Sequence, residues 1–219
     1  HLAAIARAHG LRHRATLTGF KWISRVPHLA FGYEEALGYC VAPELVRDKV
    51  GTSAAVGVVA LLASLREQGS GLQGALDAMA VRDGLYASAP VSVRVENIAL
   101  IAQAMERLRS NPPAALGGSA VTRVVDLANG LEVPDADGVN GGDYVVPPTD
   151  GMLLETADNS RVIVRPSGTE PKLKAYLDVV VAVDDEPTLA HGTGLSRAKA
   201  LAASRLAAIG ADVRVATGL

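Results

Sequence analysis

Between two alternating runs of the chain lies the octapeptide Arg165-Pro166-Ser167-Gly168-Thr169-Glu170-Pro171-Lys172. In Arg161–Val164 and in Leu173–Val181, β-branched and aromatic residues recur at every second position. This period is typical of β-strands. The octapeptide is therefore predicted to be a loop that joins two strands.

The side chains of this loop have the chemistry of an anion-binding site. Arg165 carries a planar guanidinium that can bind phosphate oxygens in bidentate fashion, and Lys172 adds a second positive charge. Ser167 and Thr169 supply hydroxyl donors, and Gly168 allows a ligand to approach the backbone closely. The alternative that composition alone leaves open is an ordinary hairpin connection with charged surface residues.

Composition bounds the class of protein. The chain has 219 residues, is 49% hydrophobic and has a net charge of −2, so it can bury a core, and neither nucleic acid nor a membrane is an expected partner. The apolar run Ala54–Leu65 is too short to span a bilayer. The single cysteine, Cys40, fits a reducing compartment, so a cytoplasmic location is expected. Because the chain starts at His1 within a helical pattern, we expect it to be a fragment of a longer protein.

The pattern of elements changes along the chain. Helices are predicted over residues 1–9, 52–68, 72–83, 96–109 and 196–209, and strands over 11–18, 91–95, 121–127, 152–156, 161–164, 173–183 and 212–216. Residues 129–148 read as a long loop. The fold class is therefore α/β plus α+β: a partial mixed α/β domain at residues 1–87 precedes an antiparallel sheet flanked by two helices at residues 88–219.

Two further segments carry candidate binding residues. Glu34 and Glu35 follow an apolar run, and their carboxylates either begin a solvated helix or accept hydrogen bonds from sugar hydroxyls. Gly19 suits close approach of a ligand to the backbone, whereas its neighbours Phe20 and Trp22 read as core residues.

Together these segments resemble the C-terminal half of the α-D-phosphohexomutase superfamily, which includes phosphoglucomutases and phosphomannomutases. The octapeptide is similar to the family's phosphate-binding loop, and Glu34-Glu35-Ala36-Leu37-Gly38 to its sugar-recognition loop. Thr16–Trp22 resembles the Thr-x-x-Gly-x-Lys loop, and Arg47–Gly51 the Lys-Asp-Gly segment. The resemblance implies that residues 1–87 form part of a third domain for sugar recognition. Residues 88–219 would then form a fourth, TBP-like phosphate-binding domain.

The resemblance also implies roles for individual residues. Phosphate would be held by one set of residues, namely Arg165, Ser167, Gly168, Thr169 and Lys172. The sugar would be held by a second set, namely Glu34, Gly19, Lys21 and Lys49. Ala36 and Val50 depart from the family pattern, which has Ser and Asp at these places. The Glu-Glu-Ala form is similar to the branch with phosphopentomutases and glucose-1,6-bisphosphate synthases.

The reaction that the family implies requires parts that this sequence does not contain. Intact members transfer phosphate through a phosphoserine and bind Mg²⁺ in domains that precede these two, with glucose 1,6-bisphosphate as intermediate. No catalytic residue and no metal ligand is therefore expected in this chain, and the isolated chain is expected to be inactive. Asp135-Ala136-Asp137-Gly138 looks superficially like a metal loop but reads as a solvated turn.

Three hypotheses follow from the sequence. The chain is the sugar- and phosphate-binding half of a mutase that interconverts sugar 1-phosphates and 6-phosphates, with a hexose or pentose phosphate and the missing N-terminal domains as partners. Alternatively, it is a non-catalytic phosphosugar-binding remnant, or an unrelated anion-binding α/β protein. The sequence does not decide glucose, mannose or pentose preference, nor the oligomeric state.

Overall fold

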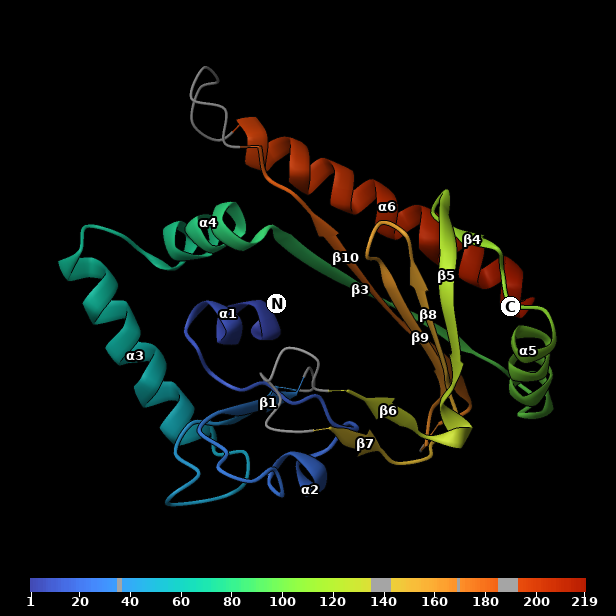
Figure 1. The fold of residues 1–219 in the computed structure, drawn as a ribbon, viewed down its shortest axis with the longest axis horizontal. Coiled ribbons are helices and arrows are strands. Elements are labelled where there is room, and N and C mark those ends of the chain that lie inside the picture. Colours follow the sequence, from blue (N-terminus) through green and yellow to red (C-terminus); the bar gives the residue numbers. More distant parts are fainter. Residues whose placement is uncertain (35–36, 135–142, 169, 185–192) are drawn as a thin grey trace. The chain divides into compact units, whose positions relative to one another are not determined.

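The structure of the protein is a computed structural model that describes residues 1–34, 37–134, 143–168, 170–184 and 193–219. The chain divides into two compact units. Unit 1 comprises His1–Ala78 and Val133–Val146, and unit 2 comprises Met79–Glu132 and Pro147–Leu219. Figure 1 labels the helices and most of the strands.

Unit 2 is built on a six-stranded sheet with the order β3-β10-β9-β8-β5-β4, in which every neighbouring pair is antiparallel (Figure 1). Its strands are β3 (Leu85–Arg94), β4 (Ala115–Leu116), β5 (Ser119–Asp126), β8 (Met152–Thr156), β9 (Arg161–Pro166) and β10 (Lys172–Val181). The predicted antiparallel sheet is confirmed. The octapeptide joins β9 to β10, which pair directly.

Two helices, α5 (Ala99–Ser110) and α6 (Thr193–Thr217), cover one face of this sheet. Every second residue of β10 points into the shared core, from Leu173 to Val181. The helices meet them with residues three and four positions apart, as expected for an amphipathic helix. The buried helical residues of this core are Ile101, Ala104, Met105, Leu108, Ala198, Ala202, Ile209 and Val213.

The opposite face of the sheet carries the strand residues whose side chains point away from the two helices. We call it the open face. Charged side chains on this face pair across strands: Arg161 contacts Asp178 at 2.7 Å, and Arg123 contacts Glu155 at 3.0 Å. Because successive side chains of a strand point to opposite faces, Arg165 and Tyr176 lie on this open face as well.

Strand β3 is longer than the strand predicted over residues 91–95. Its ten residues all pair with β10, and the predicted boundary between residues 87 and 88 lies within this strand. The division between the units lies between Ala78 and Met79, within helix α4 (Leu72–Asp83). Pro90 is tolerated because β3 is an edge strand of the sheet.

The C-terminal residues form helix and not the short strand predicted over 212–216. Helix α6 continues to Thr217 because Ile209 and Val213 extend its buried stripe. Gly210 does not break the helix: a Cβ at this position would lie 3.4 Å from Val91 and 3.6 Å from Leu177, so its small size allows close packing.

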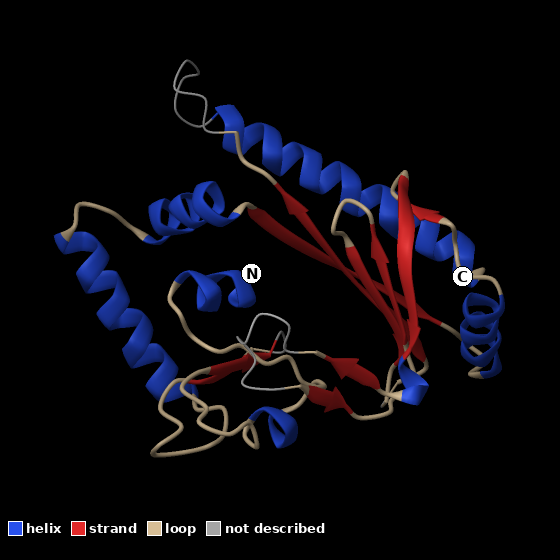
Figure 2. Cartoon of the chain, in the orientation of Figure 1, coloured by secondary structure: helices blue, strands red, loops and turns tan. Residues whose placement is uncertain are grey.

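Unit 1 contains mostly helices and loops, as Figure 2 shows. Its helices are α1 (Leu2–Ala8), α2 (Phe20–Ile23) and α3 (Gly51–Glu67), together with the first part of α4. Strands β1 (Gly32–Glu34) and β2 (Gly38–Cys40) form an antiparallel pair. A further two-stranded sheet joins β6 (Leu131–Val133) and β7 (Tyr144–Val146), within the segment predicted to be a loop.

The strand predicted over residues 11–18 is not formed. A strand needs a ladder partner, and the backbone here is engaged differently: the Ala15 amide donates to the Tyr144 hydroxyl at 3.1 Å. The guanidinium of Arg14 lies 4.6 Å from the centre of the same ring. Tyr144 therefore anchors this segment through its side chain.

The two units differ in the size of their apolar cores. The buried cluster of unit 1 consists of Phe20, Ile23 and Cys40, with Leu29 against it. Helix α3, all of which is described, has no buried residue, and Val56 in it is 70% exposed. We therefore expect the backbone amides of α3 to exchange with solvent faster than those of β10, because local opening is easier where few apolar contacts break. Hydrogen exchange read by mass spectrometry checks this, and equal protection of the two segments would contradict it.

Candidate functional site

The loop between β9 and β10 is held in place by its backbone. The Ser167 amide donates to the Lys172 carbonyl at 2.8 Å, and the Lys172 amide donates to the Glu170 carbonyl at 2.7 Å. The Val95 amide donates to the Pro171 carbonyl at 3.0 Å, which ties the loop to the end of β3. These three bonds fix the loop at one end of the sheet.

Arg165 lies half-buried where β9 enters the loop, and Tyr176 of β10 orients it. A guanidinium nitrogen of Arg165 donates to the Tyr176 hydroxyl at 3.1 Å, and the guanidinium carbon lies 5.4 Å from the ring centre. Within the described residues no carboxylate pairs with Arg165, in contrast to Arg161 on the same strand. The fork of Arg165 therefore has donors available for an anionic ligand.

Four basic residues gather at this end of the open face, and we call them the basic end: Arg94, Arg165, Lys172 and Lys174. The strand register brings them together. Lys172 of β10 lies opposite Arg94 of β3, and Lys174 of β10 lies opposite Arg165 of β9. Lys174 and Arg94 are absent from the sequence prediction. The signal for Lys174 was its position two residues after Lys172 in a strand, which puts both side chains on one face.

Three further residues of the loop were predicted to bind phosphate: Ser167, Gly168 and Thr169. Ser167 is half-buried and Gly168 is exposed. A Cβ at Gly168 would meet no atom within 4 Å, so the space above it is open and packing within the protein does not demand glycine. Thr169 lies outside the described residues.

In unit 1, Glu34 and Lys49 form an ion pair. Glu34 ends β1 and is 7% exposed, and the Lys49 ammonium contacts its Oε1 at 2.8 Å. The hydrogen bond with Glu34 and the negative charge of that carboxylate raise the pKa of Lys49. Glu34 therefore does not begin a solvated helix: its buried carboxylate pairs with the exposed side chain of Lys49. Glu35 and Ala36 lie outside the described residues.

Gly38 makes room for this pair. In β2 it lies opposite Glu34, and a Cβ there would be 2.8 Å from Cε2 of Phe20 and 2.9 Å from Oε1 of Glu34. The Phe20 ring is buried and lies 5.8 Å from the Lys49 ammonium.

We expect Gly38→Ala to lower the free energy of unfolding of unit 1 by about 1–3 kcal/mol, the usual cost of overpacking. Trp22, the single tryptophan of the chain, reports on unit 1, so urea unfolding followed by its fluorescence measures the effect. Gly57→Ala is the matched control, because a Cβ at Gly57 in α3 would meet nothing within 4 Å. Equal unfolding midpoints for the two variants would contradict this packing.

The other two predicted sugar-site residues, Gly19 and Lys21, flank Phe20 in the sequence. Gly19 has φ 115° and ψ 135° just before α2, a conformation that other residues rarely adopt. Lys21 is exposed, and its ammonium lies 5.4 Å from the ring of Trp22. It therefore makes a contact separate from the Glu34–Lys49 pair. Phe20 is a core residue as predicted, whereas Trp22 is only half-buried.

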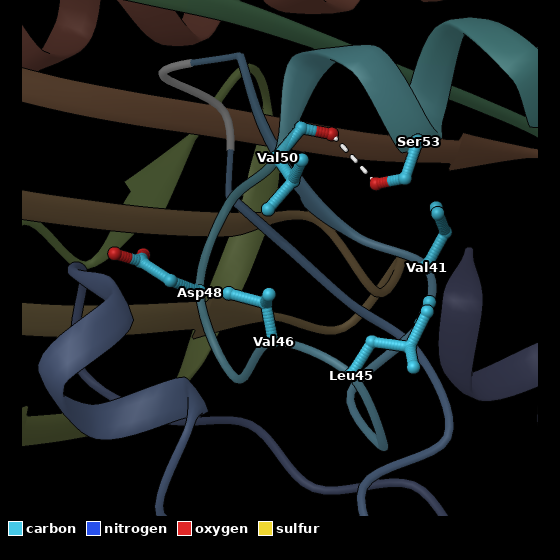
Figure 3. Close-up of a pocket in the computed structure, with 7 residues that line it drawn as sticks. Val41, Leu45, Val46, Asp48, Val50 and Ser53 are labelled. Atoms are coloured by element: carbon cyan, nitrogen blue, oxygen red, sulfur yellow. Dashed lines mark hydrogen bonds between the residues drawn. The ribbon is translucent and has the colours of Figure 1, made fainter.

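A small apolar hollow of about 130 Å³ follows β2 in unit 1 (Figure 3). Its lining comprises Val41, Ala42, Leu45, Val46, Asp48, Val50 and Ser53. The hydroxyl of Ser53 donates to the Val50 carbonyl at 3.0 Å. A lining of aliphatic side chains with one carboxylate does not suit a phosphate, so this hollow is not the candidate site.

Among the described residues, no group of three or more His, Cys, Asp or Glu side chains is placed to bind a metal ion. Asp135 and Asp137 lie outside the described part of the chain. No helix in the described ranges is long and apolar enough to cross a membrane.

Unit 2 is thus an α+β domain with two helices on one face of an antiparallel sheet and a basic cluster at one end of the other. Residues 91–182 match the family model described as phosphoglucomutase/phosphomannomutase, C-terminal domain. These residues belong to that domain family.

Curated relatives extend the similarity into unit 1. A probable phosphomannomutase of Haemophilus influenzae is 39% identical over 177 residues, which are 81% of this chain and 33% of that protein. Human phosphopentomutase is 31% identical over 194 residues, which are 81% of this chain and 31% of that protein. The chain spans about a third of the length of these relatives.

A solved structure shares the fold. The Paramecium exocytosis-sensitive phosphoprotein pp63/parafusin, a phosphoglucomutase, matches with a TM-score of 0.62 at 17% identity, covering 100% of this chain and 37% of that one. The chain therefore shares the fold of part of this structure, and residues 91–182 match the C-terminal domain family.

Proposed function

We propose that this chain is the sugar- and phosphate-binding part of a phosphosugar mutase that interconverts sugar 1-phosphates and 6-phosphates, or, for a pentose, 1-phosphates and 5-phosphates. The observation that carries the proposal is the basic end of the open face, where Arg165 is oriented by Tyr176 and has no carboxylate partner among the described residues. The names of the relatives, a phosphomannomutase, a phosphopentomutase and a phosphoglucomutase, support this reaction class.

In this proposal the basic end holds the phosphate that is not being transferred. The guanidinium of Arg165 binds two phosphate oxygens, and the ammonium groups of Lys172 and Lys174 neutralise the remaining charge. Ser167 and Thr169 donate hydroxyls, and the exposed backbone at Gly168 lets the ester approach. Phosphoryl transfer depends mainly on such positioning and charge stabilisation.

The sugar ring is held by residues of unit 1. Glu34, whose Oε1 contacts Lys49, accepts hydrogen bonds from sugar hydroxyls. Lys21 and the backbone at Gly19 provide further contacts to the sugar. Together they distinguish a phosphosugar from free phosphate.

The chemical step belongs to residues outside this chain. A phosphoserine donates its phosphoryl group to a sugar hydroxyl, the bisphosphate reorients, and its other phosphate returns to the serine. Mg²⁺, when bound, withdraws charge from the phosphoryl oxygens. We propose that other domains of the enzyme bind this ion. Cys40 is a buried free thiol, which suits a reducing compartment, so we propose a cytoplasmic enzyme.

A non-catalytic phosphosugar-binding remnant is the second candidate. It is favoured by Val50, which lines an apolar hollow at the place where the family has an acidic residue.

The test is conversion of glucose 1-phosphate, mannose 1-phosphate and ribose 1-phosphate, followed by ³¹P NMR with Mg²⁺ and a trace of glucose 1,6-bisphosphate. If the natural polypeptide extends beyond these residues, the extended form is assayed. Turnover of at least one substrate is expected. Binding of a phosphosugar without turnover would support the remnant, and absence of both would overturn the proposal.

A further inference from the structure

Glu170 bridges two members of the basic end. Its Oε1 contacts Arg94 at 2.9 Å and its Oε2 contacts Lys172 at 2.9 Å, so each carboxylate oxygen has a cationic partner. Lys172 is the more enclosed of the two cations, with a side chain 25% exposed against 64% for Arg94. An anion already occupies this part of the basic end when no ligand is bound.

This carboxylate is not what holds the loop in shape. The loop is tied by the backbone bonds Ser167–Lys172 and Val95–Pro171, which do not involve the Glu170 side chain. The side chain of Glu170 is 41% exposed and spans surface cations, an arrangement that adds little to stability. Its main effect is therefore on the charge that a ligand meets.

The surroundings favour the ionised form of Glu170. The hydrogen bond from Lys172 lowers the pKa of Glu170, and the charges of Lys172, Arg94 and Lys174 act in the same direction against a smaller effect of burial. At neutral pH the site thus holds four basic side chains and one carboxylate: Arg94, Arg165, Lys172, Lys174 and Glu170.

We propose that Glu170 is a built-in competing anion, which occupies Arg94 and Lys172 in the empty site and yields them to a phosphate ester. This inference rests on the proposed phosphate site and adds a residue that weakens binding there. A mutase must release and rebind a reorienting bisphosphate, and an internal carboxylate that reoccupies the cations favours that release.

The test compares Glu170→Gln with wild type in calorimetric titrations with inorganic phosphate and with glucose 1,6-bisphosphate. Glutamine keeps the size of the side chain and removes the charge. Removing one negative charge about 4–6 Å from a dianion is expected to tighten binding about tenfold. Glu170→Asp keeps the charge on a shorter side chain that cannot reach both cations, so its affinity should lie between the two.

Glu155→Gln is the matched control. Glu155 lies on the same open face but pairs with Arg123, and in register it faces Arg161, at the other end of β9 from Arg165. The control should bind phosphate as wild type does. If wild type binds phosphate and Glu170→Gln binds it equally or more weakly, the role of Glu170 as a competing anion is contradicted, and the proposed phosphate site is not. Absence of binding by wild type and both Glu170 variants would overturn both, whereas binding by Glu170→Gln alone would support the competing anion.

Discussion

Replacing Arg165 with alanine is expected to weaken binding of glucose 1,6-bisphosphate about 100-fold or more, as measured by calorimetry. The guanidinium of Arg165 is oriented by Tyr176 and has no carboxylate partner in the described part of the chain. A bound phosphate would therefore not compete with a carboxylate for the positive charge of Arg165. Each charge-assisted hydrogen bond contributes about 1.5–3 kcal/mol, and a fork makes two. Arg165→Lys should recover part of the affinity, because an ammonium keeps the charge but not the bidentate geometry.

Arg161→Ala is the control for this experiment. Arg161 lies on the same strand and the same face, but its guanidinium is already paired with Asp178 at 2.7 Å. Its removal should leave the dissociation constant within about twofold, since exposed ion pairs distant from a ligand contribute little. Equal losses for Arg161→Ala and Arg165→Ala would point to a general charge effect and contradict a specific role of Arg165.

Replacing Leu177 with alanine is expected to lower the free energy of unfolding of unit 2 by about 3 kcal/mol. Leu177 is 1% exposed in β10, a strand that pairs with β3 on one side and β9 on the other. Its side chain also packs beside Gly210 of α6, so truncation opens a cavity between the sheet and its covering helix. The loss combines the transfer of the side chain with the cost of that cavity.

Urea unfolding followed by far-UV circular dichroism measures this loss, since most of the regular structure that it records lies in unit 2. Leu201→Ala is the matched control: Leu201 is 44% exposed in α6, and alanine suits a helix. The control should change stability by less than about 0.5 kcal/mol. A similar loss in both variants would contradict the assignment of Leu177 to the centre of the core.

Much of unit 2 could be predicted from period-two patterns. Strands β9 and β10 match the strands predicted over residues 161–164 and 173–183, because one face of each is buried and their residues alternate. Strand β8 matches the strand predicted over residues 152–156, although four of its five residues are buried. The start of β3 was missed because Ala87, Ser88, Ala89 and Pro90 look like a linker. Their strand conformation follows from pairing with distant β10, which leaves no local signal.

The residues of the candidate site that lie in one loop could be predicted, whereas those brought together by strand pairing could not. Arg165, Ser167 and Lys172 lie within one octapeptide and could be read directly from the sequence. Arg94 is brought to Lys172 only by the register of β3 against β10. Glu34 and Lys49 lie 15 positions apart in the sequence. The family resemblance indicated both residues as sugar-site residues but did not predict that they contact each other. Side chains that meet across strands depend on the tertiary fold, and a single sequence does not encode that register locally.

The most direct measurement of the central claim is a ¹H–¹⁵N NMR titration of the chain with glucose 1,6-bisphosphate. If the basic end binds the phosphate, the largest shift changes will be at the amides of Ser167, Gly168, Lys172 and Lys174. The largest changes at Val41–Val50, around the apolar hollow, with the β9–β10 loop unperturbed, would contradict the account.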